Sequence, residues 1–190
     1  MKSILIVLNS WIMFYMALMP VTAQDKLFTG ESGIVRFESD APLELITAKS
    51  SALKGAINLD DGTFAFIIDN RSFEGFNSPL QQEHFYENYI EADKFPRSSF
   101  NGKVIEPLNH EQKGEFSVRA KGILDIHGVQ QERIISCTLS NLDDKVVVSA
   151  AFSLMLRDHN IEIPRVVNQK IAEEIKISVE LEMFPKNGNK

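Results

Sequence analysis

The chain has 190 residues with a formal net charge of −6, and 44% of the residues are hydrophobic. This length and apolar content suffice for one domain with a substantial hydrophobic core. The acidic balance repels phosphate backbones, so we expect no nucleic-acid partner. Cys137 is the single cysteine, which excludes an internal disulfide. Its position on the apolar face of an expected strand favours the role of a small buried hydrophobic residue.

Residues 1–23 differ from the rest of the chain and predict a secretory signal peptide. Lys2 precedes an apolar run over residues 4–19, and small residues lead up to a cleavage site after Ala23. An uncleaved membrane anchor is the alternative, although the run is marginal in length for crossing a bilayer. No cysteine lies near the cut, which disfavours a lipoprotein anchor. We therefore expect residues 24–190 to form the exported domain, with no stable membrane span.

From residue 24 onward, period-two alternation of apolar and polar residues is the dominant pattern, and it predicts amphipathic strands. The pattern is clearest over residues 175–183, where Ile, Val, Leu and Met alternate with Lys, Ser and Glu. Asp60-Asp61-Gly62 separates two such segments and indicates a hairpin turn. The alternating segments number eight or nine, and they lie near residues 35–37, 43–45, 53–59, 64–68, 100–104, 115–126, 133–141, 146–156 and 175–183.

One helix is expected between the strands. Ser78 is a suitable N-cap, Pro79 fits the first helical position, and Gln81 completes a capping box with Ser78. The helix should end before Asp93, because the residue that precedes Pro96 disfavours helical backbone. Its place in the chain suits a cover over one end or side of the sheet.

Successive short amphipathic strands joined by turns predict an all-β sandwich or barrel. Eight strands that close into an antiparallel barrel leave a lumen for side chains or for one small ligand. An outer-membrane barrel, apolar outside and polar within, is the inverted alternative. The only Trp lies within residues 1–23 and the chain has three Tyr, so no aromatic girdle is present. We therefore expect a soluble barrel whose apolar faces point inward.

Nothing in the sequence indicates catalysis. No Cys-x-x-Cys pair, no Gly-x-Ser-x-Gly elbow and no phosphate-binding glycine loop occurs. The histidines lack metal-binding spacing, and local hydrogen bonds in turns are their expected role; they are His84, His110, His127 and His159. We expect no enzyme activity, no cofactor and no metal site.

Several segments together resemble the YceI-like family. Over residues 83–102 a helix, an aspartate, the Phe95-Pro96 pair and a Phe-polar-Gly strand start follow in the family's order. Residues 120–129 are similar to its next hallmark, G-x-L-x-(I/L)-x-G-V, and residues 152–164 and 171–181 are similar to its C-terminal strands. The chain departs from the pattern after the second hallmark, where Gln130-Gln131-Glu132 replaces a basic residue. Residues 70–78 are specific to a subgroup.

The resemblance implies a lipocalin-like, eight-stranded antiparallel barrel with one short α-helix. It also implies a periplasmic protein of a Gram-negative bacterium that holds a polyisoprenoid-type lipid in its lumen and is not an enzyme.

A lumen that holds an apolar chain needs bulky, adaptable walls with few polar groups. The candidate lining residues, each of which has ordinary core packing as its alternative role, are Phe64, Phe66, Ile68, Phe73, Phe76, Phe85, Phe100, Phe116, Phe152, Leu154 and Met183. A polar head group would lie at the barrel mouth, where Arg is the better phosphate ligand. The candidate head-group residues, with solvated turn charges as the alternative, are Arg71, His84, Arg97, Arg157 and His159.

The leading hypothesis is a periplasmic protein that carries or buffers an apolar, isoprenoid-type lipid. The alternative is a non-catalytic envelope interaction or stress protein with a filled barrel core. A cavity above about 300 Å³ favours the lipid hypothesis over this alternative. A third option, an enzyme that uses the same lumen, requires polar side chains to converge there. The acidic surface is compatible with a monomer or a homodimer.

Overall fold

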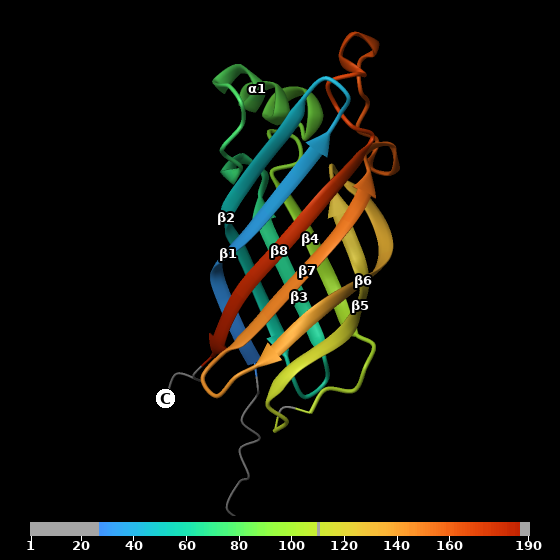
Figure 1. The fold of residues 1–190 in the computed structure, drawn as a ribbon. Helices are drawn as coiled ribbons and strands as arrows, with labels where there is room; N and C mark the ends of the chain where they lie inside the picture. Colours follow the sequence, from blue (N-terminus) through green and yellow to red (C-terminus); the bar gives the residue numbers. More distant parts are fainter. Residues whose placement is uncertain (1–26, 110, 187–190) are drawn as a thin grey trace, which may run out of the picture.

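The computed structural model describes residues 27–109 and 111–186 (Figure 1). The expected signal peptide and His110 lie outside the described residues. Each strand pairs antiparallel with its sequence neighbour, and together they form a closed barrel. The strands are β1 (Leu27–Asp40), β2 (Leu45–Asn58), β3 (Thr63–Asp69), β4 (Arg97–Val104), β5 (Gly114–Ile126), β6 (Val129–Asn141), β7 (Val146–Met155) and β8 (Glu174–Pro185).

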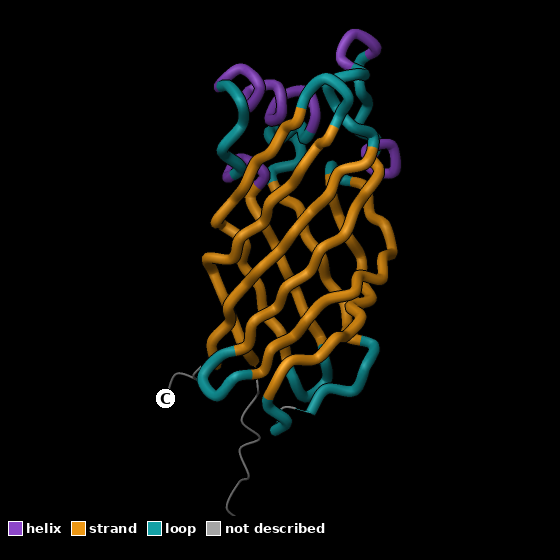
Figure 2. The backbone as a smooth tube through the Cα atoms, in the orientation of Figure 1, coloured by secondary structure: helices purple, strands orange, loops and turns teal. Residues whose placement is uncertain are grey.

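The pairing of β1 with β8 closes the barrel. Val35 lies opposite Val179 and Phe37 lies opposite Ile177, while the other edge of β1 pairs with β2. Figure 2 shows the strands tilted around a common interior. The predicted fold class is therefore confirmed. Residues 43–45 do not form a separate short strand, because residues 41–44 turn the chain and Leu45 begins β2.

The expected helix is present but short. It comprises α1 (Pro79–His84) and a following π-helical turn, η2 (Phe85–Tyr89). Ser78 caps α1, because its side chain accepts a hydrogen bond of 3.2 Å from the backbone N–H of Gln81. The Gln81 side chain accepts from the backbone N–H of Asn77, one residue before the cap, so the expected capping box is not closed. No helix in the described part of the chain is long and apolar enough to cross a membrane.

The two ends of the barrel differ in the connections that they carry (Figure 1). The helical end carries the β1–β2, β3–β4, β5–β6 and β7–β8 connections, including α1, η2 and the short helical turns η1 (Asn70–Ser72), η3 (Leu156–His159) and η4 (Arg165–Val167). The terminal end carries the other three connections, the start of β1 and the end of β8. The long β3–β4 and β7–β8 connections therefore lie at the same end.

Large side chains from β8 pack into the interior near the terminal end. Leu181 and Met183 on β8 are fully buried there. Leu181 occupies space that side chains on β1 and β2 would otherwise take, because a Cβ on Gly30, Gly33 or Gly55 would lie within 3 Å of its side chain. The Leu181 side chain thus fills the interior beside the glycines of β1 and β2.

The β4–β5 contact also depends on glycine. Gly102 and Gly122 lie directly opposite each other in the ladder. A Cβ on Gly122 would lie 2.3 Å from the carbonyl oxygen of Asn101, which is shorter than any allowed contact. The glycine that the sequence shares with the family hallmark is therefore required for close approach of two backbones.

Gly122→Ala is expected to destabilise the protein by about 1–3 kcal/mol, because the added methyl group forces β4 and β5 apart. Chemical denaturation followed by circular dichroism measures the free energy of unfolding. Ser136→Ala, at an exposed position on the neighbouring strand, is the control and should change stability by less than about 0.5 kcal/mol. Equal effects of the two substitutions would show that the barrel tolerates a wider β4–β5 contact.

Candidate functional site

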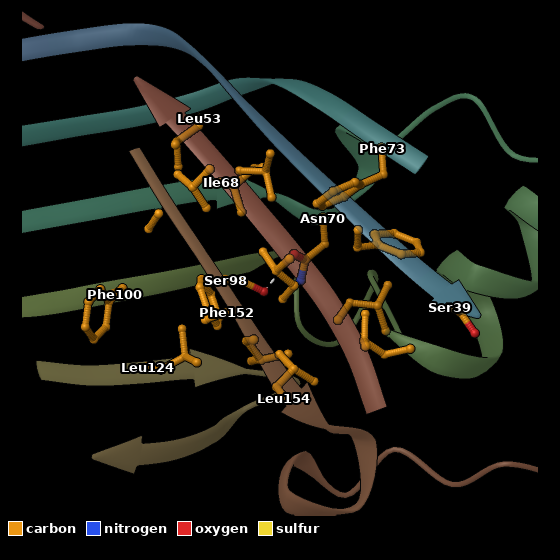
Figure 3. Close-up of a pocket in the computed structure, with 18 of the residues that line it drawn as sticks. Ser39, Leu53, Ile68, Asn70, Phe73, Ser98, Phe100, Leu124, Phe152 and Leu154 are labelled. Atoms are coloured by element: carbon orange, nitrogen blue, oxygen red, sulfur yellow. Dashed lines mark hydrogen bonds between the residues drawn. The ribbon is translucent and has the colours of Figure 1, made fainter. Parts of the chain in front are cut away.

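The barrel contains a cavity of about 430 Å³ to which every strand contributes residues, and it reaches from the helical end to the level of Val104 and Val148 (Figure 3). The eleven candidates from the sequence fall into two groups. Those that line the cavity are Phe64, Phe66, Ile68, Phe73, Phe76, Phe85, Phe100, Phe152 and Leu154. Phe116 and Met183 do not line it.

The positions of Phe116 and Met183 follow from strand register. Phe116 lies near the start of β5, where it lines a smaller pocket of about 140 Å³ beneath the β4–β5 connection. Met183 lies opposite Val146, next to the β6–β7 turn, and is fully buried. Both side chains point inward as expected, but they lie near the terminal end of the barrel and do not line the larger cavity.

Four phenylalanines form a cluster beneath the helix. Phe85 from η2 lies with its ring centroid 5.3 Å from that of Phe37 on β1 and 5.2 Å from that of Phe76. Phe73 completes the cluster, at 5.5 Å from Phe37 and 5.7 Å from Phe85. These separations are those of favourable aromatic pairs. The cluster attaches the β3–β4 connection to the barrel wall at the mouth of the cavity.

A second aromatic group lines the wall. Phe64 lies 5.6 Å from Phe66 and 5.0 Å from Phe100, measured between ring centroids. Other apolar residues on the strands, which were not among the predicted lining residues, also line the cavity. Examples are Val35, Phe37, Ile135, Cys137, Val148, Ile177 and Val179. The cavity wall is therefore almost entirely hydrocarbon.

The buried polar side chains Asn70 and Ser39 in this wall are hydrogen-bonded within the protein. Asn70 is buried; its Nδ2 donates to the carbonyl oxygen of Phe95 at 2.7 Å, and its Oδ1 accepts from the Ser98 hydroxyl at 2.8 Å (Figure 3). Ser39 accepts a hydrogen bond of 2.8 Å from the backbone N–H of Ala172. Because these bonds satisfy buried polar atoms, the wall presents mainly apolar surface to the cavity.

Cys137 lies on the cavity wall and is partly buried. Burial raises the pKa of its thiol above the ordinary value, and the nearby carboxylate of Glu106 acts in the same direction. The side chain is therefore a neutral thiol near pH 7, and it has little of the thiolate character that a nucleophile requires.

The arginines expected at the mouth lie outside the cavity lining. Arg71 donates a hydrogen bond of 2.5 Å to Asp93, and this carboxylate raises the pKa of the guanidinium. Arg157 lies 3.9 Å from the carboxylate of Asp158, and Arg97 begins β4 on the exposed surface. These side chains lie around the helical end without converging on one point.

His84 is the one head-group candidate that lines the cavity. Glu44, Gln81 and Lys170 also line it at the helical end and were not identified from the sequence. Glu44 and Gln81 are bonded to each other, with the Gln81 amide donating to the carboxylate at 2.9 Å. Lys170 lies in the β7–β8 connection, where no periodic pattern indicates which side chains face inward.

The structure corrects the expectation that His159 lies on the exposed rim. Its ring is fully buried, and within the described chain neither ring nitrogen has a hydrogen-bond partner. Its backbone carbonyl lies 2.9 Å from Nδ1 of His127, whose Nε2 lies 2.6 Å from the carboxylate of Glu91. Glu91, His127 and His159, which we call the histidine corner, therefore join three connections of the helical end.

The histidine corner is not a metal centre of three or more ligands. Among residues 27–109 and 111–186, no group of three His, Cys, Asp or Glu side chains is placed to hold a metal ion. The corner instead fixes the relative positions of the segment after η2, the β5–β6 turn and η3.

A closed eight-stranded antiparallel barrel with an apolar lumen and a helix at its mouth defines a lipocalin-like class of protein. Residues 29–183 match the YceI-like domain, and the chain belongs to the YceI-like family. The resemblance seen in the sequence is thereby confirmed. No curated protein matches the sequence.

Three solved structures share the fold. A polyisoprenoid-binding domain from Saccharophagus degradans, implicated in plant cell wall breakdown, superposes with a TM-score of 0.71 at 16% identity, covering 85% of this chain and 99% of that one. BcnA of Burkholderia cenocepacia gives 0.65 at 13% identity, covering 79% and 95%. The YceI protein of Campylobacter jejuni gives 0.60 at 15% identity, covering 74% and 85%. At these identities the comparisons establish the fold.

His159 is expected to make the protein less stable in mild acid. Burial lowers the pKa of this histidine below its ordinary value, so as the pH falls below about 6.5 the unfolded chain binds a proton that the folded chain does not. Stability is therefore lost as the pH falls through the range between the unfolded and folded pKa values. Denaturation measured at several pH values should show a shallower loss between about pH 7 and pH 5 for His159→Leu. Parallel pH profiles for the two proteins would contradict the burial argument.

Proposed function

We propose that this protein binds an apolar, isoprenoid-type lipid in its barrel lumen and carries or buffers it in the periplasm of a Gram-negative bacterium. The observation that carries the proposal is the cavity of about 430 Å³ with phenylalanine-rich walls and an end beside the helix. Its volume lies within the range of roughly 300–1,000 Å³ for small-molecule sites.

The chemistry of the wall supports a ligand that is mostly hydrocarbon. Burial of apolar surface contributes about 0.8 kcal/mol per CH₂ group, so affinity should increase with chain length until the lumen is full. The wall's buried amide and hydroxyl groups are already hydrogen-bonded within the protein. Membership of the YceI-like family and similarity to a polyisoprenoid-binding domain point to the same class of ligand.

The filled-barrel alternative receives less support, because the inward-facing side chains leave the cavity open rather than filling it. We also propose binding without catalysis. Asn70 and Ser98 are bonded to each other, and Ser39 is bonded to the backbone of Ala172, so these three polar side chains are engaged within the protein rather than directed at a common reacting position.

Filling the lumen should abolish binding without unfolding the barrel. Ala150 on β7 lines the cavity, whereas its neighbour Ala151 is exposed on the outer face of the same strand. Ala150→Phe should weaken the binding of retinol, a fluorescent isoprenoid, by at least about tenfold because the ring occupies ligand volume. Ala151→Phe is the matched control and should bind retinol like the unmodified protein.

A second readout does not depend on fluorescence. Cys137 lies opposite Ala150 in the β6–β7 ladder and lines the same cavity. Bound retinol should therefore slow the reaction of this thiol with N-ethylmaleimide. Retinol that binds with equal affinity to both alanine variants, and that leaves the thiol reaction unchanged, would place the ligand outside the lumen.

Export with cleavage after Ala23 is tested separately. N-terminal sequencing of the protein from the periplasmic fraction of its host should begin at Gln24-Asp25-Lys26. Ala23→Arg should block cleavage, because the processing site requires a small residue there. Recovery of the unmodified protein in the membrane fraction with residues 1–23 retained would instead establish the uncleaved anchor.

A further inference from the structure

Exposed apolar side chains surround the helical end of the barrel. Val166 is 89% exposed, Leu43 66%, Leu80 59% and Leu45 54%. We call these four residues the apolar rim. They come from the β1–β2 connection with the start of β2, the first turn of α1, and η4. Large apolar side chains with this much exposure, gathered at one end of a molecule, indicate an interaction surface.

Hydrogen bonds hold the three segments of the rim together. The backbone N–H of Leu43 donates to the carbonyl oxygen of Gln169 at 2.9 Å, which joins the β1–β2 and β7–β8 connections. The Asn77 amide donates to the carbonyl oxygen of Leu45 at 3.0 Å, which joins the segment before α1 to β2. The rim is therefore one ordered surface rather than three independent loops.

The rim is continuous with the cavity. Leu80 belongs to both, Glu44 and Val167 are sequence neighbours of rim residues and line the cavity, and Lys170 from the same connection as Val166 also lines it. A ligand that passes through the helical end would therefore pass beside the rim. Both ends of the described chain lie at the opposite end of the barrel, so they leave this surface free (Figure 1).

Two cations flank the most exposed rim residue. Arg165 and Lys170 are exposed on either side of Val166 in the β7–β8 connection, and neither forms an ion pair within the described part of the chain. Unpaired basic side chains beside an apolar tip complement an anionic membrane surface, to which each cation contributes favourable attraction.

We propose that the apolar rim docks on the surface of an anionic lipid bilayer, so that the ligand passes between the acyl layer and the lumen without crossing water. This inference rests on the proposed lipid-binding function. The rim side chains come from three segments with polar residues between them, which suits insertion into a deformable head-group layer better than contact with a rigid protein face. The net charge of −6 opposes approach of the rest of the protein to an anionic surface, so contact should be confined to this end.

Retinol transfer from vesicles tests the proposal. The purified protein is mixed with retinol-loaded vesicles of phosphatidylethanolamine and phosphatidylglycerol, and the transfer rate is followed by fluorescence. Docking predicts a rate that increases with vesicle concentration and decreases with salt. The double variant Leu43→Asn/Val166→Asn should transfer retinol at least about tenfold more slowly. Neither residue lines the cavity, so the affinity for retinol added without vesicles should be unchanged.

The control variant removes exposed apolar side chains from the terminal end. Leu142→Asn/Phe184→Asn changes side chains that are 39% and 50% exposed and distant from the mouth, and its transfer rate should equal that of the unmodified protein. Arg165→Gln should reduce the salt dependence of transfer.

The remaining outcomes separate the two proposals. Failure of the unmodified protein to bind retinol in the absence of vesicles would count against the proposed function itself. Normal binding combined with a transfer rate that is independent of vesicle concentration, and equal in the two double variants, would overturn docking alone. Self-association in sedimentation that is lost in Leu43→Asn/Val166→Asn would assign the rim to a second copy of the chain, which also overturns membrane docking.

Discussion

The antiparallel pairing of β1 with β8 is the constraint on which the rest of the structure depends. It joins the first and last strands, and Lys176 reaches Glu38 across this seam at 2.8 Å from a position 138 residues away in the sequence. Closure removes the free edges of the sheet and gives all eight strands a common interior. Every inward-facing residue then either fills that interior or lines a space within it.

The sizes of the side chains at each level along the barrel axis decide whether the interior is filled or left open there. Near the terminal end, Leu181, Met183 and Val146 are fully buried, and glycines on β1 and β2 allow Leu181 to fit. Where the cavity lies, small residues such as Ala150 and Cys137 interrupt the bulky wall. The cavity is therefore a consequence of where small residues lie along the strands.

Local patterns in the sequence predicted the elements because the forces that form them are local. Alternation over residues 175–183 correctly identified β8 and its buried face, and Ser78 correctly marked the start of α1. However, the alternation of apolar and polar residues does not determine how far along the barrel axis a given side chain lies. Phe116 and Met183 face inward as expected but do not line the cavity, because the pairing of β5 with β6 and of β7 with β8 places them near the terminal end.

The positions of side chains in the long connections were also harder to predict from the sequence, because tertiary contacts determine them. His159 and Lys170 both lie between β7 and β8, in a segment without regular periodicity. His159 is buried because His127 and Glu91, which are distant in sequence, fold over the same end of the barrel. No local signal distinguishes a histidine in such a contact from one in solvent. The residues at the mouth therefore had to be found from tertiary contacts.

The histidine corner explains why separate short motifs carry the family resemblance. Glu91, His127 and Asn160 have positive φ angles of 44°, 55° and 54°, and each lies in or beside a resembling segment. Backbone of this kind is maintained where surrounding contacts require it, and here the corner's hydrogen bonds link the three segments. The motifs therefore specify the frame of the helical end. The residues that line the cavity lie largely on the strands between these segments, so substitutions on the strand faces can change the shape of the cavity while the frame stays the same.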